Sequence, residues 1–245
     1  MDSQKLSQLS RAFSVQDILT ETEQLKRADT LSNAEPLFHE YDVVPYPRKG
    51  LIQGFFKRGS GQLHNIEPSY IVSEGTSLFD LPQLFCENLF YFVISGNRLI
   101  GYVHYSDLNK PVVKIPFFAM FQTVERRLWD NFKHKISEDV LRKVFESNEV
   151  DAFIRRKRRA ERDNVDLGWV GVFSFPYILR LARFYGLTDM SDEDIKLLKE
   201  VRNKVAHSDH YLVKDEKDVQ VLAEAHGMFL SLLGVPASSY SRSPR

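Results

Sequence analysis

The sequence predicts an α+β protein in which a β-α-β-β unit occurs twice and an all-α helical bundle follows. Up to about residue 113, short apolar runs of strand type alternate with short helical patterns, and two hairpin patterns recur roughly 48 residues apart. Beyond Lys114, apolar residues recur at spacings of three and four, as a buried helix face requires. We therefore expect residues 12–113 to hold the repeat, in copies of about 12–66 and 67–113, and residues 114–235 to form the bundle.

Each copy of the repeat is predicted to place a helix before a β-hairpin. Both helices begin with a hydroxyl or acidic residue next to an apolar run, which is a helix start signal. In both hairpins, a turn with glycine and basic residues separates two apolar and aromatic strands. The expected elements, in chain order, are a helix at 30–40, strands at 41–46 and 51–56, a helix at 77–88, and strands at 89–94 and 99–103.

The second copy carries a pattern that is found in a known family. It contains Tyr70-Ile71-Val72, then Leu78-Phe79-Asp80-Leu81, and its hairpin ends in Gly101-Tyr102-Val103-His104-Tyr105-Ser106-Asp107-Leu108. This repeat resembles a tandem pair of CBS domains, a Bateman-type module that commonly binds adenosine nucleotides in a cleft between its two copies. The first copy departs further, because Gly50-Leu51-Ile52-Gln53-Gly54-Phe55-Phe56 keeps the glycine of the pattern and loses both the hydroxyl and the acid.

The resemblance implies one nucleotide site, in the second copy. In the family pattern, a glycine is followed by two apolar residues, Ser or Thr, two variable residues and an Asp. Gly101 and Asp107 match it, whereas His104 stands at the hydroxyl position and Ser106 lies beside the acid. A carboxylate suits a ribose diol because it accepts two hydrogen bonds at once. The positions assigned to AMP, ADP, ATP or a dinucleotide are Tyr70, Ile71, His104, Ser106 and Asp107.

The second half of the chain has the pattern of a series of amphipathic helices. Pro176 lies inside the apolar segment 169–185 and implies a helix start or a kink there, and Gly186 follows as a helix C-cap. Ser191 and the acidic residues after it favour another helix N-terminus. The other expected elements are a helix with apolar positions from Phe117 to Phe132, helices at 138–145 and 216–233, the basic segment 153–162, and a disordered tail at 236–245.

A polar motif, Arg202-Asn203-Lys204-Val205-Ala206-His207, lies near the end of the helix that begins at Ser191. It combines a fixed cation, a neutral hydrogen-bonding group and a side chain that titrates near neutral pH, which can hold a phosphate and move a proton beside it. At about 100° per residue, Asn203 and His207 share one helix face with Lys199, and Arg202 reaches the same line. The other interpretation is a solvated polar face whose basic last turn complements the helix dipole.

The motif also matches a family pattern in its context. Glu200–His207 fits Arg-Asn-x-x-Ala-His without a break, on a helix that is followed by a loop and one last amphipathic helix. This domain resembles the HEPN family, whose catalytic members are metal-independent ribonucleases with one cleft shared between two motif helices of a dimer. The resemblance implies that His207 assists proton transfer, that Arg202 stabilises charge on the phosphoryl oxygens, and that Asn203 orients the histidine or binds phosphate. Family members without activity leave open that His207 is only a helix-terminal charge.

One concentrated basic segment is present in a chain whose formal net charge is zero. It holds six Lys or Arg residues and one acid between residues 155 and 162. Phosphate contacts need local positive charge, so RNA binding is one interpretation, and a solvated helix face is the other. The candidate RNA-binding residues are Arg155, Arg156, Lys157, Arg158, Arg159 and Lys199.

Composition narrows the classes of protein. A neutral chain has no global attraction to nucleic acid or membranes, and no apolar run has the length of a membrane span. The single cysteine, Cys86, cannot form an internal disulfide, and we expect it to be a buried thiol in a reducing compartment. The histidines lack a metal-ligand spacing, so no metal site is expected. The N-terminus lacks an apolar signal segment, and we expect a cytoplasmic protein.

Together, these features predict a metal-independent endoribonuclease of HEPN type that acts as a homodimer on RNA and leaves 2′,3′-cyclic phosphate ends. An adenine nucleotide at the CBS-like pair is expected to regulate it, and no cofactor is expected for catalysis. The alternative is a non-catalytic nucleotide-sensing, dimerisation or adaptor protein, in which Asp107 only caps the turn that follows it.

Overall fold

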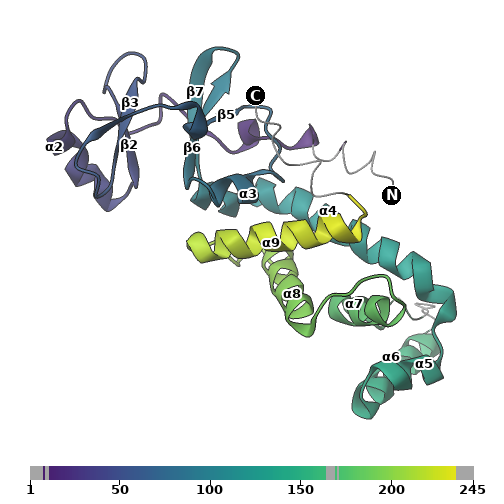
Figure 1. Ribbon diagram of the computed structural model, residues 1–245. Coiled ribbons are helices and arrows are strands. Elements are labelled where there is room, and N and C mark those ends of the chain that lie inside the picture. Colours follow the sequence, from purple (N-terminus) through teal and green to yellow (C-terminus); the bar gives the residue numbers. More distant parts are fainter. Residues whose placement is uncertain (1–7, 9–10, 164–168, 170, 236–245) are drawn as a thin grey trace. The chain divides into compact units, whose positions relative to one another are not determined.

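The structure, a computed structural model, describes residues 8, 11–163, 169 and 171–235 (Figure 1). It divides into two compact units. The mixed unit consists of the described residues within 11–113 together with Val213–Gln220, and the helical unit consists of residue 8 and the described residues within 114–212 and 221–235. The tail expected at 236–245 lies outside the described residues.

The mixed unit contains a four-stranded and a three-stranded β-sheet. In the larger sheet the spatial order is β1 (Thr20–Glu21), β7 (Arg98–His104), β6 (Phe90–Ser95) and β5 (Ile71–Ser73), and in the smaller it is β2 (Val43–Tyr46), β3 (Gly54–Lys57) and β4 (Leu63–Asn65). Only the β5–β6 pair is parallel among these, and both predicted hairpins are confirmed. The short helices of this unit are η1 (Val15–Asp17), α2 (Leu31–Ala34), η2 (Glu35–His39), η3 (Pro68–Tyr70), α3 (Leu81–Phe85) and η4 (Tyr105–Asn109).

The N-terminal segment of the first copy pairs with the second copy. β1 precedes the first hairpin in the chain, yet it pairs antiparallel with β7 of the second copy. The backbone N–H of Val15 donates to the carbonyl oxygen of Thr76 (2.8 Å), and that of Leu78 donates to the carbonyl oxygen of Phe13 (3.1 Å). β4 has no counterpart among the predicted strands, and it completes the smaller sheet beside β3. The simple β-α-β-β order therefore describes the second copy better than the first.

Two glycines admit these additional strands. A Cβ atom on Gly54 in β3 would lie 2.5 Å from the carbonyl oxygen of His64 in β4. A Cβ atom on Gly101 in β7 would lie 2.7 Å from the carbonyl oxygen of Thr20 in β1. Both distances are too short for any side chain, so each of these two glycines has a steric role in its sheet.

An aromatic cluster joins the two sheets into one core. Phe55 of β3 is fully buried, and its ring centroid lies 5.1 Å from that of Phe90 and 5.7 Å from that of Phe92, both in β6. Val43 of β2 belongs to the same cluster. Aromatic side chains bury the largest apolar areas, so this cluster provides much of the apolar contact between the copies.

Both predicted helices of the mixed unit are shorter than expected. Thr30 caps α2 by accepting a hydrogen bond from the backbone N–H of Asn33 (3.3 Å), and the chain then continues as the 3-10 helix η2, which contains Pro36. Pro82 lies in the first turn of α3, and the residues before that helix form a turn. A proline lacks the N–H that an α-helix interior requires, which explains both boundaries.

The helical unit contains most of the long helices of the described chain. Pro176 lies in the first turn of α7, so the segment expected at 169–185 becomes helical only from Phe175. Gly186 ends it with a positive φ of 68°, and Ser191 and Asp194 form a reciprocal capping box, as their positions predicted. The helices are α4 (Pro111–Phe132) and α9 (Glu216–Leu232), whose first residues belong to the mixed unit, together with η5 (Lys133–Lys135), α5 (Glu138–Val144), α6 (Ser147–Arg162), α7 (Phe175–Phe184) and α8 (Asp192–Ala206).

Aromatic residues also form the core of the helical unit. The ring centroid of Phe121 in α4 lies 4.2 Å from that of Phe229 in α9 and 5.7 Å from that of Phe175 in α7. His226 of α9 is buried in this layer and lies against Phe117 of α4, with 6.1 Å between the ring centroids. Burial lowers the pKa of His226 from 6.5 to about 4, so the imidazole is neutral in the folded chain at pH 7.

We expect His226 to make the helical unit acid-sensitive. Because its pKa is lowered on folding, the unfolded chain binds the extra proton between about pH 6.5 and pH 4, and stability is lost as the pH falls through that window. The loss amounts to at most about 3 kcal/mol. The variant His226→Leu should have a flatter dependence of the free energy of unfolding on pH. Both tryptophans, Trp129 and Trp169, lie in the helical unit, so fluorescence-detected urea unfolding at pH 7 and pH 5 measures it. An unchanged slope in the variant would show that other groups cause the acid sensitivity.

Candidate functional site

The motif residues lie at the C-terminal end of α8. Val201 and Val205 are buried and fix one face of the helix on the core, which leaves Arg202 and Asn203 half-buried. His207 is exposed, and it caps the helix with an extended backbone (φ −105°, ψ 125°). Its N–H donates to the carbonyl oxygen of Asn203 (3.1 Å). The helix face predicted for Asn203 and His207 therefore stops short of His207, whose side chain leaves from the residue after the last helical turn.

Lys114 of α4 fixes the segment that follows the helix. Its ammonium group donates to the carbonyl oxygens of His207 and His210, each at 2.6 Å. Partial burial lowers the pKa of Lys114, and the nearby carboxylate of Asp209 opposes that effect. We call residues His207–His210 the motif loop. A cation bound to two carbonyls of this loop sets its backbone, and thus the position from which the His207 ring extends.

His210 is a second imidazole in the motif loop. The ring centroids of His207 and His210 lie 5.2 Å apart at an interplanar angle of 45°, and both residues are exposed. The motif pattern includes no role for His210, although its spacing of three residues from His207 is a local signal. Nothing in the sequence indicates the contact with Lys114, which lies 93 residues before His207.

Glu125 of α4 is an acidic neighbour of Arg202. Burial raises the pKa of the Glu125 carboxyl group, and the positive charge of Arg202 lowers it. Both side chains are half-buried. A phosphate that binds Arg202 would therefore share the guanidinium with this carboxyl group or displace it.

The basic segment forms the C-terminal half of α6. Phe153 of α6 packs on Tyr177 of α7, with 4.8 Å between the ring centroids. Lys157 pairs with Glu161, and its Nζ lies 5.4 Å from the centroid of the Trp169 ring. α7 packs against α8 and lies between it and α6 (Figure 1), so the basic segment and the motif occupy different sides of α7 in one copy. Exposed candidate residues for RNA binding are Arg155, Arg156, Arg158 and Arg159 on α6 and Lys199 on α8.

The candidate nucleotide residues of the second copy gather where β7 ends and η4 begins. The backbone N–H of His104 donates to Oδ2 of Asp107 (2.8 Å), and Oδ1 of Asp107 lies 2.9 Å from Nζ of Lys110. The hydroxyl of Ser106 lies 2.8 Å from Nδ1 of His104. The structure thus shows the capping role that the sequence left open for Asp107, and both of its oxygens are engaged within the turn.

Asp42 connects this turn to the first copy. One of its carboxylate oxygens lies 3.3 Å from Nε2 of His104, without the alignment of a hydrogen bond, and the other lies 3.2 Å from Nη1 of Arg58. Burial lowers the pKa of His104, whereas the carboxylates of Asp42 and Asp107 act in the opposite direction. His104 therefore lies between carboxylates of both copies. No sequence pattern indicates a role for Asp42, which immediately precedes β2.

Tyr70 and Ile71 lie at the edge of the aromatic cluster. The ring of Tyr70 stacks on Phe90, with 5.2 Å between centroids and an interplanar angle of 13°, and it meets Phe55 edge-on at 5.2 Å. Ile71 is half-buried at the start of β5, opposite Phe92 in β6. Both residues therefore have a packing role at the junction of the two sheets.

Cys86 corrects one expectation. It is exposed at the end of α3 instead of buried, because the buried face of that helix is formed by its neighbours Leu84 and Phe85. Partial desolvation raises the pKa of its thiol, as does the charge of Glu87, which disfavours a reactive thiolate. Within the described residues, no group of three or more His, Cys, Asp or Glu side chains could hold a metal ion. No helix in that part of the chain combines the length and apolarity needed to cross a membrane.

Comparison with known proteins gives weak similarities. No protein family and no curated protein matches this chain. Among solved structures, the CBS domain of a bacterial CNNM/CorC family Mg²⁺ transporter in complex with ATP matches 44% of this chain and 93% of its own, at 17% identity and a TM-score of 0.33. The same domain with the inhibitor IGN95a matches at 17% identity, over 45% of this chain and 79% of its own, also with a TM-score of 0.33. A TM-score this low supports no conclusion about ligands, so the candidate sites rest on the contacts described above.

We expect Lys114→Met to loosen the motif loop. The variant keeps the length of the side chain and removes the charged donor to two carbonyls, which contributes about 1–2 kcal/mol. The amide of His207, bonded to Asn203, should then exchange with solvent roughly tenfold faster or more, as measured by hydrogen exchange and NMR. The exposed Lys196 on α8 offers a matched control, because Lys196→Met removes a charge from the same unit without touching the loop. Equal exchange in both variants would contradict the role of Lys114.

Proposed function

We propose that the helical unit is a metal-independent endoribonuclease of HEPN type. The observation that carries this proposal is the position of His207, exposed at the end of α8 on a backbone that Lys114 holds, with Arg202 and Asn203 one turn earlier. An imidazole beside a guanidinium provides the proton transfer and the charge stabilisation that cleavage of a phosphodiester needs.

In the proposed reaction, the 2′-hydroxyl oxygen of RNA attacks the adjacent phosphorus, and the bond from phosphorus to O5′ breaks. The products are a 2′,3′-cyclic phosphate and a free 5′-hydroxyl, so one proton leaves the 2′-hydroxyl and one is added to O5′. His207 performs one of these transfers. Arg202 donates a forked pair of hydrogen bonds to the phosphoryl oxygens, and Asn203 adds a neutral hydrogen bond. The exposed arginines of α6 would bind flanking phosphates.

A homodimer is one way to supply the second proton-transfer group that this chemistry needs. The reaction needs a base and an acid, and one imidazole serves as only one of them at a time. A second copy of the chain would supply a second His207 in a shared cleft, as the resemblance to the HEPN family implies. His210 is the alternative source, because it lies in the same motif loop of the same copy. The two sources differ in which histidine is essential.

We expect His207→Ala to reduce RNA cleavage by roughly 10²- to 10⁴-fold, the usual contribution of acid–base catalysis. Purified protein would be incubated with RNA in EDTA, and the product ends would be tested for cyclic phosphate. His207 is exposed, so the variant should retain its unfolding midpoint. Full activity in this variant would overturn the assignment.

His210→Ala is the matched control for that experiment. It removes another exposed imidazole three residues away, and it should leave cleavage within about threefold of the wild type if the second histidine comes from the partner copy. Sedimentation of both variants would establish whether the dimer is intact. A loss as large as that of His207→Ala would instead place both proton transfers in one copy.

We further propose that an adenine nucleotide binds near the start of η4 and regulates cleavage. His104, Ser106 and Asp107 gather there in one turn, and Asp42 approaches from the first copy. Binding of a ribose by Asp107 requires its oxygens to exchange their present partners, among them Lys110, for the diol. This requirement specifically favours the second candidate function, a non-catalytic adaptor or dimerisation module whose CBS-like pair holds no ligand.

Substitutions of Asp107 separate these two functions. Asp107→Asn retains an acceptor for the backbone N–H of His104, so it should preserve the turn while weakening a ribose contact. Asp107→Ala also removes the cap and should cost about 1 kcal/mol without any ligand. Thermal unfolding with AMP, ATP and no nucleotide measures both effects. We expect the wild type to gain stability with a nucleotide and Asp107→Asn to lose most of that gain. A full gain in Asp107→Asn would exclude this site.

A further inference from the structure

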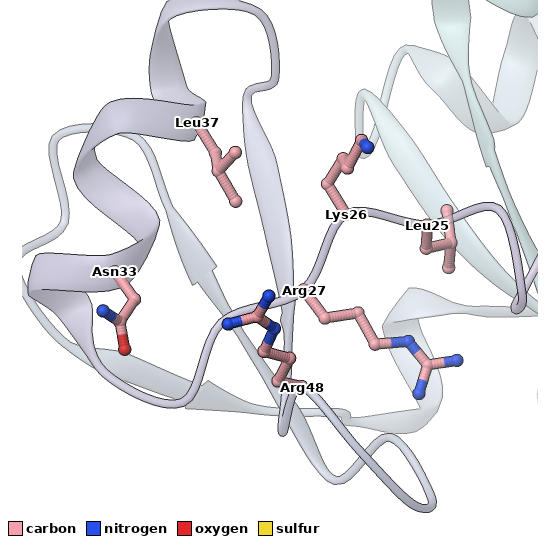
Figure 2. A pocket seen from close by; sticks show the side chains of 6 residues that line it. All are labelled: Leu25, Lys26, Arg27, Asn33, Leu37 and Arg48. Atoms are coloured by element: carbon pink, nitrogen blue, oxygen red, sulfur yellow. The ribbon is translucent and has the colours of Figure 1, made fainter.

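A pocket in the first copy of the repeat has a composition that neither candidate site explains. Its volume is about 390 Å³, near the lower end of the range for small-molecule sites. It lies between the segment before α2, the helices α2 and η2, and the turn after β2. Six side chains line it (Figure 2): Leu25, Lys26, Arg27, Asn33, Leu37 and Arg48.

Three of the six lining residues are cationic and none is acidic, in a chain whose formal net charge is zero. Lys26 and Arg48 are exposed, and neither forms an ion pair with any residue that the structure describes. The lining of this pocket is therefore positively charged, which favours an anion over a cation as its occupant.

Arg27 and its neighbours fix the walls of the pocket. Nη2 of Arg27 donates to the carbonyl oxygen of Thr22 (2.7 Å), and Nη1 donates to that of Gly50 (3.0 Å), so one guanidinium ties the segment before α2 to the turn after β2. The backbone N–H of Arg48 donates to Oδ1 of Asp29 (2.9 Å). This nearby carboxylate therefore binds the backbone of Arg48 and holds the turn that presents the Arg48 side chain.

The remaining lining residues complete a site for a polar group with an apolar part. Oδ1 of Asn33 accepts a hydrogen bond from the hydroxyl of Thr30 (3.0 Å), so the Asn33 side chain has its amide donors left for a ligand. Figure 2 shows the Arg48 guanidinium turned toward Asn33. Leu25 and Leu37 are half-buried and supply apolar surface on the same pocket.

We infer that this pocket binds the phosphate group of a small phosphorylated molecule. A phosphate monoester carries nearly two negative charges and several acceptor oxygens, which matches two uncommitted cations and an amide better than a single carboxylate does. The forked donors of Arg48 hold the phosphate, Lys26 and Asn33 add contacts, and the two leucines accept an apolar part of the ligand. This site is distinct from the turn at His104 and Asp107, and it does not depend on RNA cleavage.

The test is a titration of the intact chain with inorganic phosphate, pyrophosphate, AMP and adenosine. Binding is measured by calorimetry and by the NMR shifts of the amides around Arg48. We expect the three phosphate-containing probes to bind and adenosine, which lacks phosphate, to bind at least about tenfold more weakly. Affinity should also fall as salt increases. A comparison of the affinities for AMP and inorganic phosphate shows whether the pocket prefers free phosphate or a phosphate ester.

Three variants make the titration specific. Arg48→Gln should weaken phosphate binding by roughly tenfold or more, whereas Lys49→Gln removes an adjacent exposed charge outside the pocket and should have little effect. Asp107→Asn should leave inorganic phosphate binding unchanged, which separates this pocket from the proposed nucleotide site. The inference is overturned if none of the phosphate probes shifts the amides around Arg48, or if Lys49→Gln weakens binding as much as Arg48→Gln.

Discussion

The absence of a side chain at two glycines makes the mixed unit possible. At Gly101 the backbone of β1 occupies the space of a Cβ atom, and at Gly54 the backbone of β4 does the same. Without room at Gly101, the N-terminal strand could not pair with β7, and the two copies would be joined mainly through their aromatic cluster. The turn that holds His104 and Asp107 follows β7 directly, so the candidate nucleotide residues depend on this steric constraint as well.

Charged side chains in both units bind backbone groups at the ends of elements. Lys114 holds two carbonyls after α8, Asp107 accepts the N–H of the residue before η4, and Arg27 holds two carbonyls beside the pocket. These backbone groups lack partners within helices or sheets. A charged side chain contributes most per contact at such unpaired groups. Residues proposed to support binding or catalysis therefore also stabilise the structure. If a variant of such a residue loses function, its stability must be measured as well.

Local signals explain what the sequence predicts well. Ser191 with Asp194 and the glycine at position 186 fix helix ends within a few residues, and each hairpin is set by its own turn. The pairing of Thr20 with Tyr102 and the contact of Lys114 with His207 join residues far apart in the chain. Hydrophobic periodicity cannot predict such pairs, because it shows only which face of an element is apolar.

The motif loop is held on both sides, which gives the proposed regulation a physical route. Lys114 binds two carbonyls of the loop. Val213, three residues after His210, is bound by the side chain of Asn109, which donates to its carbonyl oxygen (2.7 Å) and accepts from its N–H (3.0 Å). Asn109 is the last residue of η4, which begins directly after His104. A ligand that favours one conformation of η4 would therefore act on the residue that holds the chain beyond the loop, and its effect on cleavage is limited by its differential affinity for the two conformations.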